Sequence, residues 1–179
     1  MSKITVVIGE PATGKSTLMK HIMRKRGSWV FEASTKYVPY HLSDKLCIIG
    51  RYDDMDHQFP GTDRMSMACQ QYVLNFISDN SDFNYLIEGD RLSNKTFLWE
   101  LRDRGHDLVV LLLRPSSDVL QDRRESEREQ SDRFIKSRQT KIANLVKFCV
   151  DAGIPLIETD HSVPVHTALI TSDILKDRI

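Results

Sequence analysis

Short apolar runs alternate with segments of helical spacing along the chain. Residues 3–9 (KITVVIG) are rich in β-branched side chains and end at a glycine, which predicts a buried strand. A helix is predicted next; it ends at Gly27, and its apolar face consists of Leu18, Met19, Ile22 and Met23. Four further apolar runs predict strands at residues 28–34, 83–90, 107–113 and 154–158. Residues 36–52 could add two shorter strands.

Helical spacing recurs between these runs. It predicts helices at residues 65–80, 94–105, about 116–130 and 165–177, and a longer helix ending at Gly153. That longer helix is expected to turn Phe134, Ile135, Ile142, Leu145, Val146 and Cys149 inward. Alternating strands and helices form right-handed βαβ units. We therefore predict an α/β three-layer sandwich with a central, mainly parallel, five-stranded sheet, whose ligands lie at the carboxyl ends of the strands.

Composition narrows the class of protein without identifying a partner. The 179 residues suit one domain (1–179), and 25 basic residues balance 25 acidic ones, so net charge draws the chain toward no nucleic acid. No apolar run is long enough to cross a bilayer, and the first residues lack a signal-peptide pattern. Three scattered cysteines without a CxxC pair indicate core residues in a reducing compartment. A cytoplasmic protein is expected.

Residues 9–17 (GEPATGKST) contain the phosphate-binding pattern G-x-x-x-x-G-K-S between a strand and a helix. Successive backbone N–H groups can curl around phosphate oxygens there, and the positive end of the following helix faces the anion. Lys15 can reach the β- and γ-phosphates, and the Ser16 hydroxyl can bind Mg²⁺. The residues predicted to bind ATP are Gly9, Glu10, Pro11, Ala12, Thr13, Gly14, Lys15, Ser16 and Thr17.

This loop resembles the G-x-P-x-x-G-K-[ST] form of small P-loop kinases. Pro11 matches that form, whereas Ala12 stands where glycine is usual. A GTPase would need a guanine-reading N-K-x-D motif, and "SNKTF" does not supply it. A motor ATPase normally needs a larger chain. The resemblance therefore favours a kinase of the P-loop NTPase fold, similar to nucleoside monophosphate kinases.

A basic segment supports the same interpretation. Eight basic residues oppose four acidic ones between Arg123 and Lys147. Arginines on a lid can stabilise the charge that develops during phosphoryl transfer, so a lid is predicted at about residues 115–140, with Arg124 and Arg128 as catalytic candidates. The alternative is a solvated helix face, because these two arginines are spaced i, i+4 among glutamates.

Glu88 and Asp90 end the predicted strand at residues 83–90, and Arg91 follows them. Acidic residues at this place in P-loop folds hold Mg²⁺ or orient the acceptor, so Ser16, Glu88 and Asp90 are the predicted metal residues. The alternative is that Asp90 begins a turn and caps the helix near Asn94.

A kinase also needs an acid near the acceptor hydroxyl. The candidates are Asp53, Asp54, Asp56 and Asp63, and Asp63 in "PGTDRMS" (residues 60–66) is preferred. Its alternative role is to cap the helix expected after it, where the helix N-terminus would lower its pKa. Arg64 could bind a phosphate of the acceptor.

The segments "IIGRY", "GTDRMSM", "LIEGDRL" and "FIKSRQTKIANL" together resemble phage-encoded P-loop kinases that phosphorylate 5-hydroxymethyluracil in DNA. The likeness extends from the phosphate-binding loop to about Leu145. Its more specific parts are GTDR and RxTK, the latter being Arg138, Thr140 and Lys141. It implies ATP-dependent transfer to a base hydroxymethyl group in double-stranded phage DNA, a step in thymine hypermodification in the infected cell's cytoplasm.

The residues themselves leave the acceptor open. The basic segment suits contact with DNA phosphates, and Tyr52, His57 and Phe59 could stack on a flipped base. The neutral net charge suits a nucleoside or nucleoside monophosphate equally well. A third interpretation is a non-catalytic regulator that binds a nucleotide.

Overall fold

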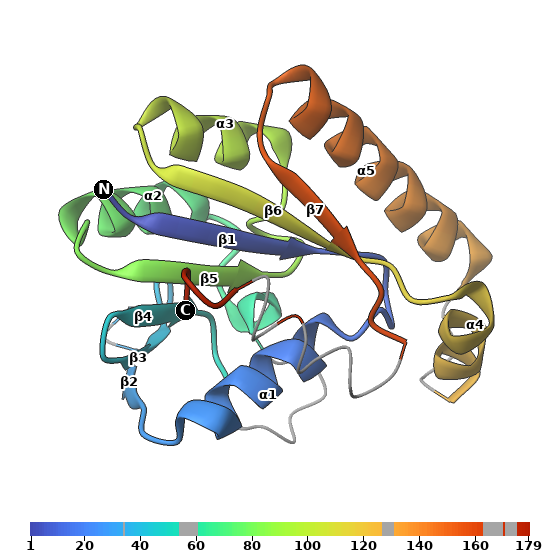
Figure 1. Cartoon of the computed structure of the whole chain (residues 1–179), viewed down its shortest axis with the longest axis horizontal. Coiled ribbons are helices and arrows are strands. Elements are labelled where there is room, and N and C mark those ends of the chain that lie inside the picture. Colours follow the sequence, from blue (N-terminus) through green and yellow to red (C-terminus); the bar gives the residue numbers. More distant parts are fainter. Residues whose placement is uncertain (34, 54–60, 127–130, 163–169, 171–174) are drawn as a thin grey trace.

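The computed structural model describes residues 1–33, 35–53, 61–126, 131–162, 170 and 175–179. They form an α/β three-layer sandwich around one sheet of strand order β2-β3-β4-β5-β1-β6-β7 (Figure 1). Five consecutive strands in that order are mutually parallel. They are β4 (Leu46–Ile49), β5 (Asn84–Glu88), β1 (Lys3–Ile8), β6 (Asp107–Leu113) and β7 (Leu156–Thr159). The predicted fold class is confirmed.

In the described residues the sheet has seven strands rather than five, because residues 36–52 contribute the two shorter strands that the sequence allowed, β3 and β4. Antiparallel pairing adds β2 (Val30–Glu32) and β3 (Tyr40–Ser43) beyond β4. The run at residues 28–34 thus supplies only a three-residue strand at one end of the sheet, and β4 takes the parallel position beside β5. Burial explains the difference: every residue of β4 is buried, as a strand covered on both faces requires, whereas Val30 in β2 is exposed.

Two apolar cores lie on the two faces of the sheet. Helix α1 (Lys15–Arg26) covers one face, where Leu18, Met19 and Ile22 pack on β-strand side chains such as Val7. The other face is covered by α2 (Gln70–Asp79), α3 (Lys95–Asp103) and α5 (Asp132–Asp151) (Figure 1). Helix α4 (Ser117–Ser126) lies beyond the carboxyl end of β6. All three cysteines are buried, as expected of core residues.

Several predicted helices differ in their limits or exposure. The helix expected at residues 65–80 begins only at Gln70, and a short 3-10 helix, η1 (Thr62–Arg64), precedes it. Phe134 was expected to face inward, but it is exposed and the Arg138 guanidinium lies over its ring. Most of the helix predicted at residues 165–177 falls outside the described residues. No helix in the described ranges is long and apolar enough to cross a membrane.

The register of the parallel strands brings their carboxyl ends to one edge. Val7 of β1 pairs with Glu88 of β5 on one side and with Leu111 of β6 on the other. The phosphate-binding loop follows β1 at this edge, and residues 89–94 follow β5 beside it. The predicted polar segments are therefore neighbours in space.

Candidate active site

The phosphate-binding loop connects β1 to α1 by a tight turn. Gly14 (φ 90°) and Ala12 (φ 66°) both have left-handed backbone conformations, which alanine adopts less readily than glycine. Thr13 is buried, and its hydroxyl donates to the Glu10 carbonyl at 2.9 Å. The loop thus keeps its curled shape although Ala12 replaces the usual glycine.

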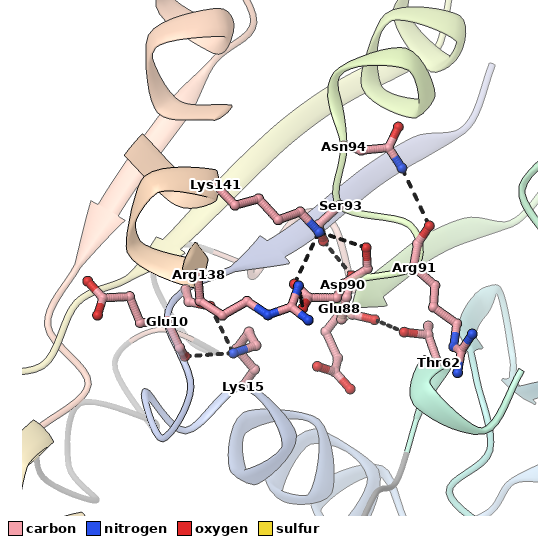
Figure 2. A network of polar contacts seen from close by, with 12 residues as sticks. Glu10, Lys15, Thr62, Glu88, Asp90, Arg91, Ser93, Asn94, Arg138 and Lys141 are labelled. Atoms are coloured by element: carbon pink, nitrogen blue, oxygen red, sulfur yellow. Dashed lines mark hydrogen bonds and ion pairs between the residues drawn. The ribbon is translucent and has the colours of Figure 1, made fainter. Parts of the chain in front are cut away.

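Lys15 is the first residue of α1 and reaches back across this loop. Its Nζ donates to the carbonyl oxygens of Gly9 at 2.9 Å and Glu10 at 2.8 Å (Figure 2). Ser16 and Thr17 occupy the next positions of the helix. The lysine ammonium thus lies within the loop that leads into the first turn of α1. That turn carries the positive end of the helix dipole.

His161, which the sequence patterns did not single out, contacts the phosphate-binding loop at Thr13. His161 follows β7 and is buried, and its Nδ1 lies 3.1 Å from the Thr13 carbonyl oxygen. A carbonyl only accepts, so this hydrogen bond needs the proton on Nδ1. A Cβ at Gly14 would come within 2.3 Å of His161 Nδ1. The one available signal was the position of His161 directly after a parallel strand.

Two arginines of α4 reach this part of the site differently. Arg124 pairs with Glu10 in the phosphate-binding loop, with Nη2 2.6 Å from the carboxylate oxygen. Arg123 donates to the carbonyl oxygens of His161 at 2.9 Å and Ser162 at 3.0 Å. Arg128, the other predicted lid arginine, lies outside the described residues. Helix α4 thus places one arginine, Arg124, against the loop predicted to bind ATP.

Glu88, the last residue of β5, is a buried carboxylate with a hydroxyl partner. It is 3% exposed, and its Oε1 accepts from the Tyr52 hydroxyl at 2.7 Å. Burial raises the pKa of Glu88, whereas the charge of Lys15 and the bond from Tyr52 act to lower it. Burial also raises the pKa of Tyr52, which keeps its phenol protonated as the donor. Tyr52 is therefore part of the interior, and the expectation that it stacks on a base is wrong.

Gly61 fits against this buried pair. A Cβ at Gly61 would lie 2.3 Å from Glu88 Oε1 and 2.6 Å from the Tyr52 hydroxyl. The backbones of Gly61 and Arg51 form two hydrogen bonds, and the Thr62 hydroxyl donates to the Glu88 carbonyl at 2.9 Å (Figure 2). Packing thus explains the first two residues of the GTDR motif, Gly61 and Thr62. Their contacts hold η1 beside the end of β5.

Asp63 lies in η1 and does not cap α2. No side-chain cap bond is made there, and the residue before α2 is Cys69. Asp63 is an exposed residue, yet desolvation of its carboxylate, followed by the charge of Asp90, raises its pKa. The expected lowering by a helix N-terminus is wrong, because α2 begins too far along the chain. Arg91, Lys15 and Arg138 act in the opposite direction and lower this pKa.

The other acceptor candidates divide into two groups. Asp53 pairs with Arg64 at 3.3 Å and with Arg51 at 3.9 Å, so Arg64 is held by a neighbouring carboxylate. Asp54, Asp56, His57, Phe59 and Pro60 lie outside the described residues. Among the described acceptor candidates, Asp63 is the one whose pKa shift includes the charge of Lys15.

Asp90 is paired through both carboxylate oxygens. Arg138 binds Oδ2, and Lys141 Nζ lies 3.2 Å from Oδ1 and 2.9 Å from the Asp90 carbonyl oxygen. Helix α3 is instead capped by Asn94, whose side chain accepts from Phe97 N at 3.0 Å. The alternative role of Asp90 as a cap is therefore wrong. Arg138 and Lys141 of the RxTK motif therefore both bind Asp90. The Thr140 hydroxyl instead donates to the Lys136 carbonyl of its own helix.

The donor set suits Mg²⁺ only in part. No three His, Cys, Asp or Glu side chains within the described ranges form a metal cluster. Ser16 and Glu88 carry oxygen atoms of the kind that Mg²⁺ prefers, and a nucleotide would have to supply most of the ligands. Because two cations already occupy the Asp90 carboxylate, Ser16 and Glu88 fit this ion better than Asp90 does.

Solved structures share this fold, whereas no family model and no curated protein matches the chain. An unliganded sugar kinase from Janibacter sp. HTCC2649 aligns with 98% of this chain and 94% of its own, at 19% identity and a TM-score of 0.53. A deoxyadenosine kinase from M. mycoides, with the products dCMP and dCDP bound, aligns with 97% of this chain and 99% of its own, at 14% identity and a TM-score of 0.49. The chain therefore shares the α/β fold of the sugar kinase.

Gly61→Ala should unfold far more readily than the wild-type protein. Gly61 (φ 79°) and Gly27 (φ 83°) share a left-handed backbone, but no atom lies within 4 Å of a Cβ at Gly27. Gly27→Ala is the matched control and should cost about 1 kcal/mol from conformation alone. Gly61→Ala adds the clash with Glu88 and Tyr52. Thermal and urea unfolding measure both variants; equal losses would contradict the packing role of Gly61.

Proposed function

We propose that this protein is an ATP- and Mg²⁺-dependent kinase that phosphorylates a hydroxyl of a nucleoside or nucleoside monophosphate. The observation that carries the proposal is that the charge of the loop lysine, Lys15, lowers the pKa of two carboxylates, Glu88 at the end of β5 and Asp63 in η1. The charge of Lys15 acts on the pKa of both acids. A donor phosphate group held at Lys15 would thus face acidic side chains, as phosphoryl transfer requires.

Each group has a role in this reaction. The loop amides and Lys15 would hold the β- and γ-phosphates, and Arg124 would turn from Glu10 to the developing charge. Mg²⁺, held by Ser16 and Glu88, would neutralise phosphate charge. Asp63 would orient the acceptor hydroxyl and take its proton as the oxygen–phosphorus bond forms and the bond to the ADP oxygen breaks. Its raised pKa suits it to accept that proton.

A small acceptor agrees with the neutral net charge and with the fold shared with a sugar kinase. A second candidate acceptor is the hydroxymethyl group of 5-hydroxymethyluracil in duplex DNA. It is favoured by the meeting of GTDR and RxTK, the two most specific segments of the sequence resemblance, around Asp63 and Asp90. A non-catalytic regulator would use the same ATP site without any acceptor.

Transfer of label from [γ-³²P]ATP to a panel of acceptors tests these functions. The panel contains nucleosides, their 5′-monophosphates, and duplex DNA with and without 5-hydroxymethyluracil. We expect label on the small acceptors, and Lys15→Ala should abolish transfer because it removes a phosphate ligand. Label on modified DNA alone would assign the second function. ATP binding without transfer to any acceptor would leave the regulator.

Asp63→Asn should reduce kcat by about 100-fold or more, because an amide cannot take the hydroxyl proton. The melting temperature should change little, since Asp63 caps no helix. Asp79→Asn, a substitution of the last residue of α2, is the matched control and should leave both quantities unchanged. Near-normal turnover of Asp63→Asn would exclude Asp63 as the acid that serves the acceptor.

Tyr52→Phe should move the acid limb of the pH profile. Glu88 must be ionised to hold Mg²⁺, and burial raises its pKa, so kcat/KM should fall as the pH drops through a value above that of ordinary glutamates. The Tyr52 bond lowers this pKa, and its removal should shift the limb to higher pH. Tyr37→Phe, where the ring stacks on Tyr72, is the control. An unmoved limb would mean that Glu88 does not set it.

A further inference from the structure

More positive than negative charge gathers around Asp90. Arg138 and Lys141 both pair with its single carboxylate, and they lie one turn apart on α5. Arg91 donates to the Asp63 carbonyl oxygen at 2.8 Å, an acceptor without a formal charge. Figure 2 shows the side chains of Arg138 and Lys141 extending from α5 toward Asp90. The group Arg91, Arg138 and Lys141, called the basic cluster below, faces two carboxylates, those of Asp90 and Asp63, and so carries one positive charge more than they balance.

The basic cluster is open to a ligand. The side chains of Asp90, Arg138 and Lys141 are 39%, 31% and 29% exposed, so water and solutes reach them. A purely structural clamp between α5 and the sheet would not need this opening.

The basic cluster lies on the acceptor side of the proposed reaction. The charges of Asp90, Arg91 and Arg138 all act on the carboxylate of Asp63, which would orient the acceptor hydroxyl. The donor phosphates have separate partners, because the phosphate-binding loop holds Lys15 and receives Arg124 at Glu10. An anion bound at the basic cluster would thus belong to the molecule that receives the phosphoryl group.

We propose that the basic cluster binds a phosphate ester of the acceptor, next to the hydroxyl that reacts. This inference rests on the proposed function and narrows its substrate from nucleosides in general to those that carry phosphate. Guanidinium groups match phosphate oxygens in pairs, and Lys141 adds a point charge. Asp90 holds Arg138 and Lys141 extended, which lowers the entropy lost when the phosphate binds. The ester is either the monophosphate of a nucleotide or a phosphodiester of DNA.

Equilibrium binding to the full chain, with a non-hydrolysable ATP analogue present, tests this subsite without turnover. The probes are thymidine, 5-hydroxymethyl-2′-deoxyuridine, their 5′-monophosphates, and duplex DNA containing 5-hydroxymethyluracil. We expect each monophosphate to bind at least about tenfold more tightly than its nucleoside, as charged hydrogen bonds allow. A preference for the duplex alone would assign the site to the phosphodiester. Equal affinity for all probes would overturn the proposal.

Lys141→Gln and Arg138→Gln should each remove most of the preference for phosphate and leave affinity for the nucleoside and the ATP analogue unchanged. Lys147→Gln is the matched control, because Lys147 lies on the same helix, is 76% exposed and pairs with Asp151. Thermal unfolding accompanies each measurement. A lowered melting temperature with intact phosphate preference would make the cluster a structural clamp, and loss of ATP-analogue binding would place it on the donor side. Both results overturn the subsite.

The outcomes separate this inference from the proposed function. Monophosphate binding that depends on Arg138, without transfer to any acceptor, would keep the subsite and reject the kinase. Transfer to nucleosides and monophosphates with equal KM, unaffected by Arg138→Gln, would keep the kinase and reject the subsite.

Discussion

The site depends on one buried carboxylate, that of Glu88, which is stable in the interior only if polar groups donate hydrogen bonds to it. Glu88 ends β5 in the interior, and an ionisable group there is costly unless polar partners surround it. The Tyr52 hydroxyl meets its side chain, and the Thr62 hydroxyl meets its main-chain oxygen. Both partners come from the connection between β4 and α2. The hydrogen bonds to Glu88 therefore hold Tyr52 and Thr62 at the end of β5, and Asp63 directly follows Thr62.

This constraint also explains why glycine is needed at two places in the connection. Gly50 and Gly61 lie so close that a Cβ at Gly50 would come within 2.7 Å of the Gly61 carbonyl carbon. The next residue, Arg51, pairs with Gly61 through two backbone hydrogen bonds, and a side chain at Gly50 would prevent this close approach. The contacts around the buried Glu88 thus fix the backbone at residues 50–52 and 61–62, and the position of η1 follows from them.

Local patterns in the sequence were enough for the features that depend on local physics. The spacing of Leu18, Met19 and Ile22 predicted α1, and the run at residues 107–113 predicted β6 with its limits. The phosphate-binding loop was recognisable because its geometry needs small residues at fixed positions. The choice of β4 over residues 28–34 as the parallel neighbour of β5 was not predictable, since it depends on which of two similar runs buries both faces.

Local sequence patterns could not predict the features that depend on contacts between distant segments of the chain. The pKa of Asp63 rises first because burial desolvates its carboxylate and then because of the charge of Asp90, which belongs to another segment. His161 supports Thr13 across almost the whole length of the chain, and a lone histidine after a strand carries no pattern of its own. The pairing of Asp90 with Arg138 and Lys141 joins residues that only the docking of α5 brings together.

The arrangement of strand lengths in the sheet has a consequence for how the chain behaves at high concentration. The longest strands, β1 and β6, lie inside the sheet, while its two ends in the described structure are the three-residue β2 and the four-residue β7. Unpaired backbone at a sheet edge is the usual template for joining strands of separate molecules. Short terminal strands leave few such groups on either side. The sheet that carries the site is thereby protected against growth into intermolecular aggregates.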